Sequence, residues 1–436
     1  MVTNVPEQVD VAIVGAGPAG LATACALRQN SINAVVLDAA PEASPFSRAT
    51  ILHSHTLEAL DTLGVTGELL REGVRISAFN AWSRKARLTQ LKFSKMHAKY
   101  PFTLGIPQSV TEDALMVKLA ALGGKVIWGA KVSALVDDGK DVLLEVKGGA
   151  GSTAYIRADY VVGADGLHST VRKALYIPYE GGDYTASMLA ADVRLSTTGT
   201  FLFQPHEASL CFGKDNFALF MAFEPGLWRV LLPQDNAPKH PTKQQIQARI
   251  DERAPSGVHV EELLWSNRFR IHHRQASQYR KGRVFLVGDA AHTFTPAGGQ
   301  GMNAGIQDGI KLAEILRAAI EDYEDSDADL DRYEQVRRPV ANDIIKMTHR
   351  LTVVGQWKSA WARWARDWFI ELFMQLSGVE ENMTRKVAAF DRRSPSSRPQ
   401  SSTSQPSTSQ PSILQSSKSQ SSVEEMWNYA SRADLH

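Results

Sequence analysis

Three closely spaced glycines near the start of the chain, Gly15, Gly17 and Gly20, form the pattern Gly-x-Gly-x-x-Gly. Between a strand and a helix, the first glycine allows a tight turn and the second lets the backbone approach a pyrophosphate. The third lets the helix pack closely on the strand. The N–H groups at the start of such a helix bind phosphate oxygens. The pattern therefore predicts a site for a dinucleotide.

The segments around these glycines have the character that such a site needs. Val9 to Val14 is short, β-branched and bounded by glycine, which predicts a buried strand, and Pro18 to Gln29 is expected to form the next helix. Ala34 to Leu37 predicts a second strand, which leads to Asp38. A carboxylate there accepts hydrogen bonds from a ribose and repels a 2′-phosphate, so we expect an adenosine without that phosphate. This first pattern does not distinguish FAD from NAD.

Two further glycine-containing segments follow predicted strands later in the chain. Gly163-Ala-Asp165-Gly166-Leu-His-Ser169-Thr-Val-Arg172 comes after the apolar residues Tyr160 to Val162. Gly288-Asp289-Ala-Ala-His292 comes after Val284 to Val287 and continues through Pro296-Ala-Gly-Gly299-Gln-Gly301-Met-Asn303. Strands that alternate with helices in this way predict an α/β fold with a parallel sheet.

With the three segments in this order, the chain resembles the single-component FAD-dependent aromatic-ring monooxygenases of the para-hydroxybenzoate hydroxylase type, which include phenol and polyketide hydroxylases. The resemblance covers roughly residues 8 to 350, and three ordered motifs are far more specific than one. It implies an α/β fold with a Rossmann-like FAD-binding domain, an inserted, mainly antiparallel β-sheet substrate domain, and C-terminal helices. The alternation of apolar and polar residues from Ser187 to Leu232 is typical of such a sheet.

The resemblance assigns expected roles to individual positions. Arg48 would lie near the ribityl-pyrophosphate of FAD, and Gln108, ahead of a helix expected from Asp113 to Leu122, would lie beside the ribityl chain. Asp289 would bind a ribityl hydroxyl. The full set of residues expected to contact the cofactor comprises Gly15, Gly17, Gly20, Asp38, Arg48, Gln108, Asp165, Gly166, Arg172, Gly288, Asp289, Gly299, Gly301, Met302 and Asn303. Within it, the segment from Asp165 to Arg172 matches a motif that the family uses around FAD and NAD(P)H.

Pro296 to Asn303 resembles the loop and helix start that line the isoalloxazine ring of FAD. Its glycines would let backbone N–H groups approach the ring with no side chain between them. A helix N-terminus at Gly301 to Asn303 would stabilise the negative charge of a reduced flavin. The apolar periodicity predicts that the main helix runs from Ile306 to Ile320. Pro296, at the start of this loop, is one candidate catalytic residue.

His53 is the second catalytic candidate. His53 and His55 lie near the expected flavin, where an imidazole could act as a base on a phenol. A structural histidine is the competing and commoner interpretation, and we expect it for His292. His272 and His273 have no cysteine or aspartate nearby at metal-ligand spacing, so we expect no metal site.

The resemblance and the composition together predict how the chain is divided. The FAD-binding domain is expected to comprise residues 1–75, 108–180 and 276–325, and the substrate sheet residues 76–107 and 181–275. The substrate would lie between them, where six phenylalanines either line the site or belong to the core: Phe201, Phe203, Phe212, Phe217, Phe220 and Phe223. A helical region is expected over residues 326–392, with a tryptophan stripe between Arg350 and Leu376. Residues 393–423 are rich in Ser, Gln and Pro and predict a disordered tail.

The resemblance implies that NAD(P)H reduces FAD and that dioxygen then forms a flavin C4a-hydroperoxide, which hydroxylates or epoxidises an aromatic or polyketide-like molecule. Secondary metabolism or aromatic catabolism is the expected setting. The choice of NADH or NADPH, and a Baeyer–Villiger outcome, stay open. The alternatives are an FAD-dependent oxidase, dehydrogenase or halogenase on a similar fold, or a non-catalytic FAD-bound interaction module. The chain lacks the Trp-x-Trp-x-Ile-Pro signature of the halogenases.

The composition narrows the partners. Lys+Arg is 48 and Asp+Glu is 47, so a net charge of +1 gives no field that would attract nucleic acid or an anionic membrane. Two cysteines are too few for a disulfide framework. Without a recognisable signal peptide or transmembrane segment, we expect a soluble cytoplasmic enzyme. The oligomeric state stays open.

Overall fold

The computed structural model describes residues 5–44, 49–83, 86–198, 203–213, 216–296, 298–321 and 327–355. They belong to one contact unit, Met1–Arg393, while the second unit, Ser394–His436, lies outside the described residues. Arg48, Phe201, the predicted tail and the predicted tryptophan stripe also lie outside them. None of the described helices is both long enough and apolar enough to cross a membrane.

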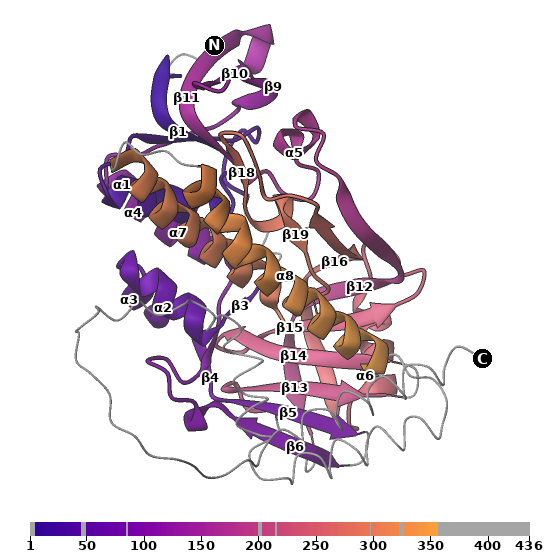
Figure 1. The fold of residues 1–436 in the computed structure, drawn as a ribbon. Helices are drawn as coiled ribbons and strands as arrows, with labels where there is room; N and C mark the ends of the chain where they lie inside the picture. Colours follow the sequence, from indigo (N-terminus) through magenta and orange to yellow (C-terminus); the bar gives the residue numbers. More distant parts are fainter. Residues whose placement is uncertain are drawn as a thin grey trace, which may run out of the picture. The chain divides into compact units, whose positions relative to one another are not determined.

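The first sheet contains the strands that the three glycine-containing segments follow. Its strands run in the order β17-β18-β11-β1-β2-β8, and the pairs from β18 to β8 are parallel, as predicted. The strands β9 and β10 extend it as an antiparallel flap on β11 (Figure 1). The bounds are β1 Gln8–Val14, β2 Ala34–Leu37, β8 Val126–Ile127, β9 Lys131–Asp137, β10 Val142–Lys147, β11 Thr153–Gly163, β17 Arg280–Lys281 and β18 Val284–Leu286.

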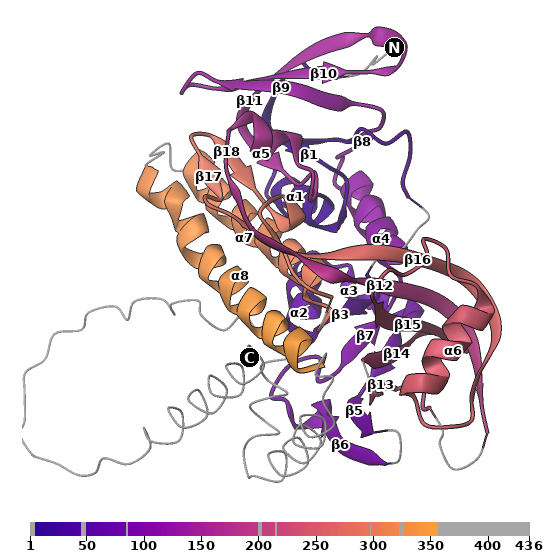
Figure 2. The same cartoon turned by 90° about the vertical axis from the view of Figure 1, so that its right-hand side faces the viewer.

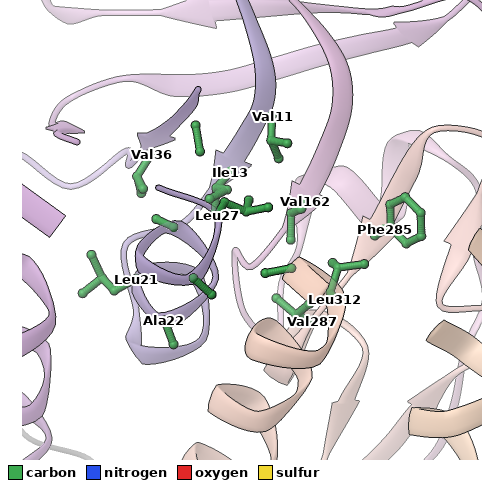
Figure 3. Packing of buried hydrophobic residues seen from close by; sticks show 14 of the residues in the cluster. Val11, Ile13, Leu21, Ala22, Leu27, Val36, Val162, Phe285, Val287 and Leu312 are labelled. Atoms are coloured by element: carbon green, nitrogen blue, oxygen red, sulfur yellow. The ribbon is translucent and has the colours of Figure 1, made fainter. Parts of the chain in front are cut away.

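Helices α1 (Pro18–Gln29) and α7 (Gln300–Glu321) pack against this sheet. Fully buried side chains such as Ile13, Leu27 and Leu312 lie between the helices and the sheet (Figure 3). The two helices approach so closely at Gly309 that a Cβ there would overlap the side chain of Thr23 in α1, so this contact requires a glycine.

The second sheet is larger in extent and almost entirely antiparallel. Its order is β19-β16-β12-β15-β14-β13-β5-β6, and only the β13–β5 pair is parallel (Figure 2). The bounds are β5 Ala78–Ser83, β6 Arg87–Lys92, β12 Tyr179–Thr197, β13 Glu207–Phe212, β14 Phe217–Glu224, β15 Leu227–Gln234, β16 Val258–Ala276 and β19 His292–Thr293. The long pair β12–β16 changes register at several irregularities, so it bends along its length.

The two faces of the second sheet have different partners. One face packs against α6 (Lys243–Arg253) through a cluster that includes Phe220, Trp228 and Ile246. The opposite face carries the remaining apolar clusters, which share Leu219. Because side chains alternate along a strand, the predicted phenylalanines are divided between these faces.

Phe203 and Phe220 lie on the α6 face, with ring centroids 4.5 Å apart. Phe212 and Phe217 lie on the opposite face. Of the two interpretations of the six phenylalanines, the core interpretation holds for Phe203 and Phe220, which pack in the α6 cluster.

A small sheet, β3-β7-β4, lies beside strand β14 of the large sheet. It consists of β3 Ile51–Leu52, β7 Thr103–Gly105 and β4 Val74–Ile76. A Cβ at Gly105 would overlap the carbonyl oxygen of Ala222 in β14, so only glycine allows this approach. One edge strand of the large sheet is β19, in which His292 pairs with Gln275 of β16. The segment that follows β18 therefore runs from the first sheet into the second.

Two helices begin earlier than the sequence pattern predicts. Helix α4 runs from Gln108 to Ala121 rather than from Asp113, and α7 begins at Gln300, before the apolar periodicity from Ile306 and next to the helix N-terminus expected at Gly301 to Asn303. Their first turns are polar or glycine-rich, so apolar periodicity does not reveal them. The other described helices are α2 Ser54–Thr62, α3 Thr66–Glu72, α5 Thr170–Ala174 and α8 Asp327–Gly355, with short 3-10 turns at Phe93–Lys95, Gly149–Gly151 and Gly288–Ala290.

Candidate active site

Three loops meet at the carboxyl-terminal end of the first sheet. The strands β1, β11 and β18 are parallel neighbours: Val14 pairs with Gly163, and Gly163 pairs with Leu286. Each strand leads into one of the three glycine-containing segments. Segments far apart in the sequence therefore form one edge, which is where open α/β sheets bind ligands.

The three glycines of the first loop are needed for different reasons. Gly15 has φ 112°, and a Cβ there would overlap the carbonyl oxygen of Ala164. A Cβ at Gly20 would overlap the carbonyl oxygen of Gly15. Gly17 differs, because its φ is −74° and a Cβ would meet no described heavy atom within 4 Å beyond its chain neighbours. This open space, at a helix N-terminus without a side-chain cap, fits a pyrophosphate.

Asp38 follows β2, as predicted, and its carboxylate holds the first loop. Oδ2 accepts a hydrogen bond from Ala16 N at 2.7 Å, and Oδ1 accepts one from Ala40 N at 2.8 Å. Each carboxylate oxygen can accept a second hydrogen bond. The side chain can therefore support the loop and still receive a ribose hydroxyl.

Asp165 caps the short helix α5 in the second loop. Its Oδ2 accepts hydrogen bonds from Thr170 N (2.6 Å) and Val171 N (3.2 Å), while Oδ1 is buried and has no partner among the described residues. Burial raises the pKa of Asp165 above its usual value, although these hydrogen bonds act in the opposite direction. A buried oxygen without a partner at this edge is suited to a ligand that donates a hydrogen bond. Gly166, next to it, has φ 77° and supplies the turn.

Arg172 connects the second loop to the third. Its guanidinium donates to the carbonyl oxygens of Leu167 and Ala290, both at 2.9 Å, and lies 3.8 Å from the centroid of the Tyr179 ring. Burial lowers the pKa of Arg172, but these contacts keep the group in a defined position. The Tyr179 hydroxyl in turn donates to the carbonyl oxygen of Asp289 at 2.9 Å. Arg172 thus positions the third loop.

The third loop turns at Gly288, which has φ 57° and packs against Ala19 of α1. Gly288 N donates to Asp308 Oδ2 at 3.3 Å. The neighbouring Asp289 is exposed at the edge where the three loops meet, as a ligand to a ribityl hydroxyl must be. The backbone of this loop is therefore held by Asp308, while Asp289 is exposed.

A buried ionic network holds the third loop in place, and the sequence patterns did not predict it. The Asp308 carboxylate contacts His292 Nε2 at 2.5 Å and Arg337 Nε at 2.6 Å, and all three side chains are at most 2% exposed. Burial by itself would raise the pKa of Asp308, but the neighbouring His292 and Arg337 lower it to about 2. A signal was present in the sequence, because Asp308 interrupts the apolar side of the predicted helix.

The loop from Pro296 to Asn303 is held by its own backbone and by Asn303. Gly298 and Gly299 have φ 96° and 63°, and Gly299 N donates to the Pro296 carbonyl oxygen at 3.1 Å. The Asn303 amide donates to the carbonyl oxygens of Gly299 (2.7 Å) and Ile51 (3.0 Å). The Asn303 side chain is thus a structural tie between α7 and β3, which leaves the helix start available to a ligand through its backbone.

At the start of α7, a Cβ on Gly301 would meet no described heavy atom within 4 Å beyond its chain and helix neighbours. Met302, next in the chain, is half-buried against the main core. Gly301 therefore resembles Gly17: the packing of the described residues does not require a glycine, but close approach of a planar ring would.

His53 is buried between strand β7 and the loop that follows Pro296. Its Nε2 donates to the Gly298 carbonyl oxygen at 2.8 Å, which leaves Nδ1 to accept from the Thr103 hydroxyl at 3.2 Å. Its backbone N–H donates to Asn303 Oδ1. Burial lowers the pKa of His53 to about 4, so the ring is neutral at pH 7. With both ring nitrogens engaged, the geometry favours a positioning role over that of a base.

We expect the pH dependence of stability to reveal this buried neutral ring. The unfolded histidine has a pKa near 6.5, so below that pH the unfolded state binds more protons than the folded state. Stability should therefore fall by about 2 kcal/mol between pH 7 and pH 5 through His53 alone. Urea unfolding at both pH values should show a smaller fall in His53→Gln, whereas the exposed His240→Gln should behave as the wild type. An unchanged fall in His53→Gln would contradict the assignment.

Gln108 begins α4 and contacts the chain just after Arg48. Its Oε1 accepts from Ala49 N at 3.1 Å, and its Nε2 donates to Glu112 Oε1 at 2.8 Å. The structure thus brings Gln108 next to the segment that leads to Arg48. The position of Arg48 itself lies outside the described residues.

Together these features match the requirements of FAD. The space at Gly17 and Gly301 would accept a pyrophosphate and a planar ring, and Asp38, Asp165 and Asp289 place acceptors along one sheet edge. The fold and site define an FAD-binding α/β enzyme.

Comparison with known proteins agrees with this class. Residues 8–348 match the model of the FAD binding domain family. The chain is 34% identical over 359 residues to a 12-dehydrotetracycline 5-monooxygenase/anhydrotetracycline 6-monooxygenase of Streptomyces rimosus, covering 79% of this chain and 69% of the relative. It is 29% identical over 395 residues to pentachlorophenol 4-monooxygenase of Sphingobium chlorophenolicum, covering 87% and 72%. The solved p-nitrophenol 4-monooxygenase of Pseudomonas putida superposes with a TM-score of 0.81 at 25% identity, covering 89% of this chain and all of that one.

The chain therefore belongs to the FAD binding domain family, within its FAD-dependent aromatic hydroxylases. The predicted family, the FAD cofactor and the monooxygenase class are confirmed. The roles of individual residues stay predictions.

Proposed function

We propose that this enzyme hydroxylates an aromatic or polyketide-like small molecule with NAD(P)H as reductant and dioxygen as oxidant. One observation carries the proposal: three loops suited to a dinucleotide meet at one edge of the first sheet. The loop from Pro296 to Asn303, which we call the ring-facing loop, follows β19 of the second sheet, and that sheet has an apolar face. The named activities of the relatives, on tetracycline precursors and chlorophenol, support a substrate of this class.

The first sheet would hold the cofactor. Gly17 and the N-terminus of α1 would bind the pyrophosphate, Asp38 the adenosine ribose, and Asp289 the ribityl chain. The backbone around Gly299 and Gly301 would face the ring. Bound FAD supplies the redox chemistry, which comprises hydride acceptance from NAD(P)H and activation of dioxygen.

The substrate would bind on the face of the second sheet opposite α6. Leu210, Leu219 and Leu231 lie side by side on neighbouring strands of this face and are only half-buried. Large apolar side chains in the middle of a sheet are normally covered, so their exposure favours a ligand that covers them. This face belongs to residues 76–107 and 181–275, which we propose as the substrate domain.

The residues of the chain would position the reacting groups and exclude water from them. The Nε2–H of His53 fixes the Gly298 carbonyl, and Asn303 fixes the neighbouring Gly299 carbonyl. These contacts hold the loop after Pro296 in one conformation. Pro296 itself has a fixed φ and no backbone N–H to donate. A rigid loop with apolar surroundings keeps water from reacting groups.

The direct test is the absorbance spectrum of the purified full chain, followed by anaerobic NADPH or NADH and then air. We expect oxidised-flavin bands that NAD(P)H bleaches and oxygen restores. Addition of phenols or polyketide-like aromatics should accelerate the bleaching and give a hydroxylated product by mass spectrometry. Hydrogen peroxide without any oxygenated product would favour an oxidase. A colourless protein that takes up no added FAD would contradict the proposal.

A further inference from the structure

An ion pair lies on the otherwise mostly apolar face that we assign to the substrate. Arg229 of β15 is directly opposite Met221 of β14 on one side and Asp192 of β12 on the other. Asp192 is in turn opposite Trp265 of β16. Residues directly opposite one another in neighbouring strands share a face, so these four side chains form one row across the sheet.

The geometry of this pair is bidentate. Arg229 Nε contacts Asp192 Oδ1 at 2.5 Å, and Arg229 Nη2 contacts Asp192 Oδ2 at 2.8 Å. The guanidinium lies 5.1 Å from the Trp265 ring centroid and 5.6 Å from that of Phe223. The Arg229 side chain is 1% exposed, whereas that of Asp192 is 15% exposed. The carboxylate is therefore the member of the pair that a ligand can reach.

This row is linked by packing to the loop from Pro296 to Asn303. Met221, next to Arg229, packs in the same cluster as Ile51 of β3. The carbonyl oxygen of Ile51 accepts a hydrogen bond from Asn303, and a Cβ at Gly299 would lie 3.2 Å from the Ile51 side chain. Two side chains thus connect the ion pair to the loop that would line the flavin ring.

The charges of the pair restrict what can bind there. The guanidinium already has a fork-to-fork partner, so an incoming carboxylate would meet the negative charge of Asp192 without a free cation to offset it. Each Asp192 oxygen accepts one hydrogen bond from Arg229 and can accept another. A neutral hydroxyl can donate to that remaining acceptor, and its ring can lie on Leu219 and Leu231.

We propose that Asp192, held by Arg229, is a specificity-determining residue that accepts a hydrogen bond from a substrate hydroxyl and selects neutral phenols or enols over aromatic carboxylates. The inference rests on the proposed function, because it assumes that the substrate lies on this face. Arg229 acts through Asp192 and is a positioning residue.

The test uses the FAD-loaded full chain with a pair of probes that differ in one group, 2-naphthol and 2-naphthoate. Binding is measured at pH 7 from the change in flavin absorbance. We expect the wild type to bind the naphthol about tenfold more tightly, the effect of a hydrogen bond to a charged group. In Asp192→Asn the naphthol should bind about tenfold more weakly and the naphthoate more tightly, because the negative charge that repels the naphthoate is gone while the positive charge of Arg229 remains. A gain of naphthoate binding is not expected from structural damage.

The matched control is Asp183→Asn, which removes a carboxylate from the same strand. Asp183 is 46% exposed and is paired with Arg274 and His272, and this variant should keep the wild-type preference. If Asp192→Asn does not fold, Arg229→Lys is the second variant, because it keeps the positive charge but loses the bidentate contact with Asp192. It should reduce the difference in affinity between the naphthol and the naphthoate. A wild type without preference for the naphthol, or the wild-type preference in both variants, overturns the inference. FAD content and bleaching by NADPH, recorded on the same samples, report separately on the proposed function.

Discussion

Replacement of Gly17 by valine is expected to give a folded protein that no longer retains FAD. The backbone at Gly17 is extended, with φ −74°, which valine adopts easily, and a Cβ there would meet no described heavy atom within 4 Å beyond its chain neighbours. The added side chain would instead fill the space in front of the α1 N-terminus, where the pyrophosphate should bind. We expect FAD affinity to fall by about 100-fold or more, which corresponds to ~2.7 kcal/mol.

The measurement compares FAD content after gel filtration with the melting temperature of the apoprotein. Gly67→Val is a matched control, because a Cβ at Gly67 in α3 also meets no described heavy atom within 4 Å beyond its chain and helix neighbours. It should keep FAD. Gly20→Ala should behave differently from both, because its Cβ would overlap the Gly15 carbonyl oxygen and prevent folding. Full FAD retention by Gly17→Val would show that the first loop does not hold the pyrophosphate.

The same three glycines show what the sequence could predict and where its information ended. Spacing and context located the loop, the strands around it and Asp38, because these depend on neighbours within a few dozen residues. They also gave Gly17 a different role from Gly15 and Gly20, as the glycine that lets the backbone approach a pyrophosphate. What they could not show is that Gly15 packs against Ala164, which follows strand β11 and is distant in the sequence.

The second sheet was predicted less completely for a related reason. Alternation indicated strands but not which face of each strand would be covered by α6, so it left open whether each phenylalanine lines the site or belongs to the core. The face of a strand is set by register, and the bent pair β12–β16 changes register several times. Local sequence patterns do not encode such irregularities.

His53 illustrates the same limit at the candidate site. The sequence placed an imidazole near the flavin, and its residue type suggested a base. Only the fold brings the Gly298 carbonyl and the Thr103 hydroxyl to its two nitrogens. Chemistry inferred from a residue type therefore depends on partners that come from two other segments of the chain.

The largest loss of stability is expected from Asp308→Ala. This change leaves the buried Arg337 and His292 without the carboxylate between them, and breaking a buried charge pair costs about 3–5 kcal/mol. Asp308 also accepts from Gly288 N, so the third loop should loosen and FAD affinity should fall as well. Urea unfolding of the apoprotein and FAD titration measure the two effects separately.

The matched control for this network is a pair of arginines in one helix. Arg337→Met removes the buried partner and should destabilise the protein by about 3 kcal/mol, whereas Arg332→Met, at an exposed position of α8, should change stability by less than about 0.5 kcal/mol. The double variant Asp308→Leu/Arg337→Met replaces the pair by apolar side chains, and it should lose much less than the sum of the two single changes. Additive losses would show that the two residues do not stabilise one another.

The pH dependence of stability should show whether the negative charge of Asp308 stabilises the folded protein. Its folded pKa of about 2 lies below the value near 3.9 of an unfolded aspartate. The carboxylate therefore contributes stability that is fully present above pH 4 and is lost as the pH falls through about 2. Asp308→Asn should be less stable than the wild type at neutral pH, and the difference should shrink as the solution approaches pH 2. A difference that stays constant between pH 7 and pH 2 would mean that the network is held by shape and hydrogen bonds rather than by charge.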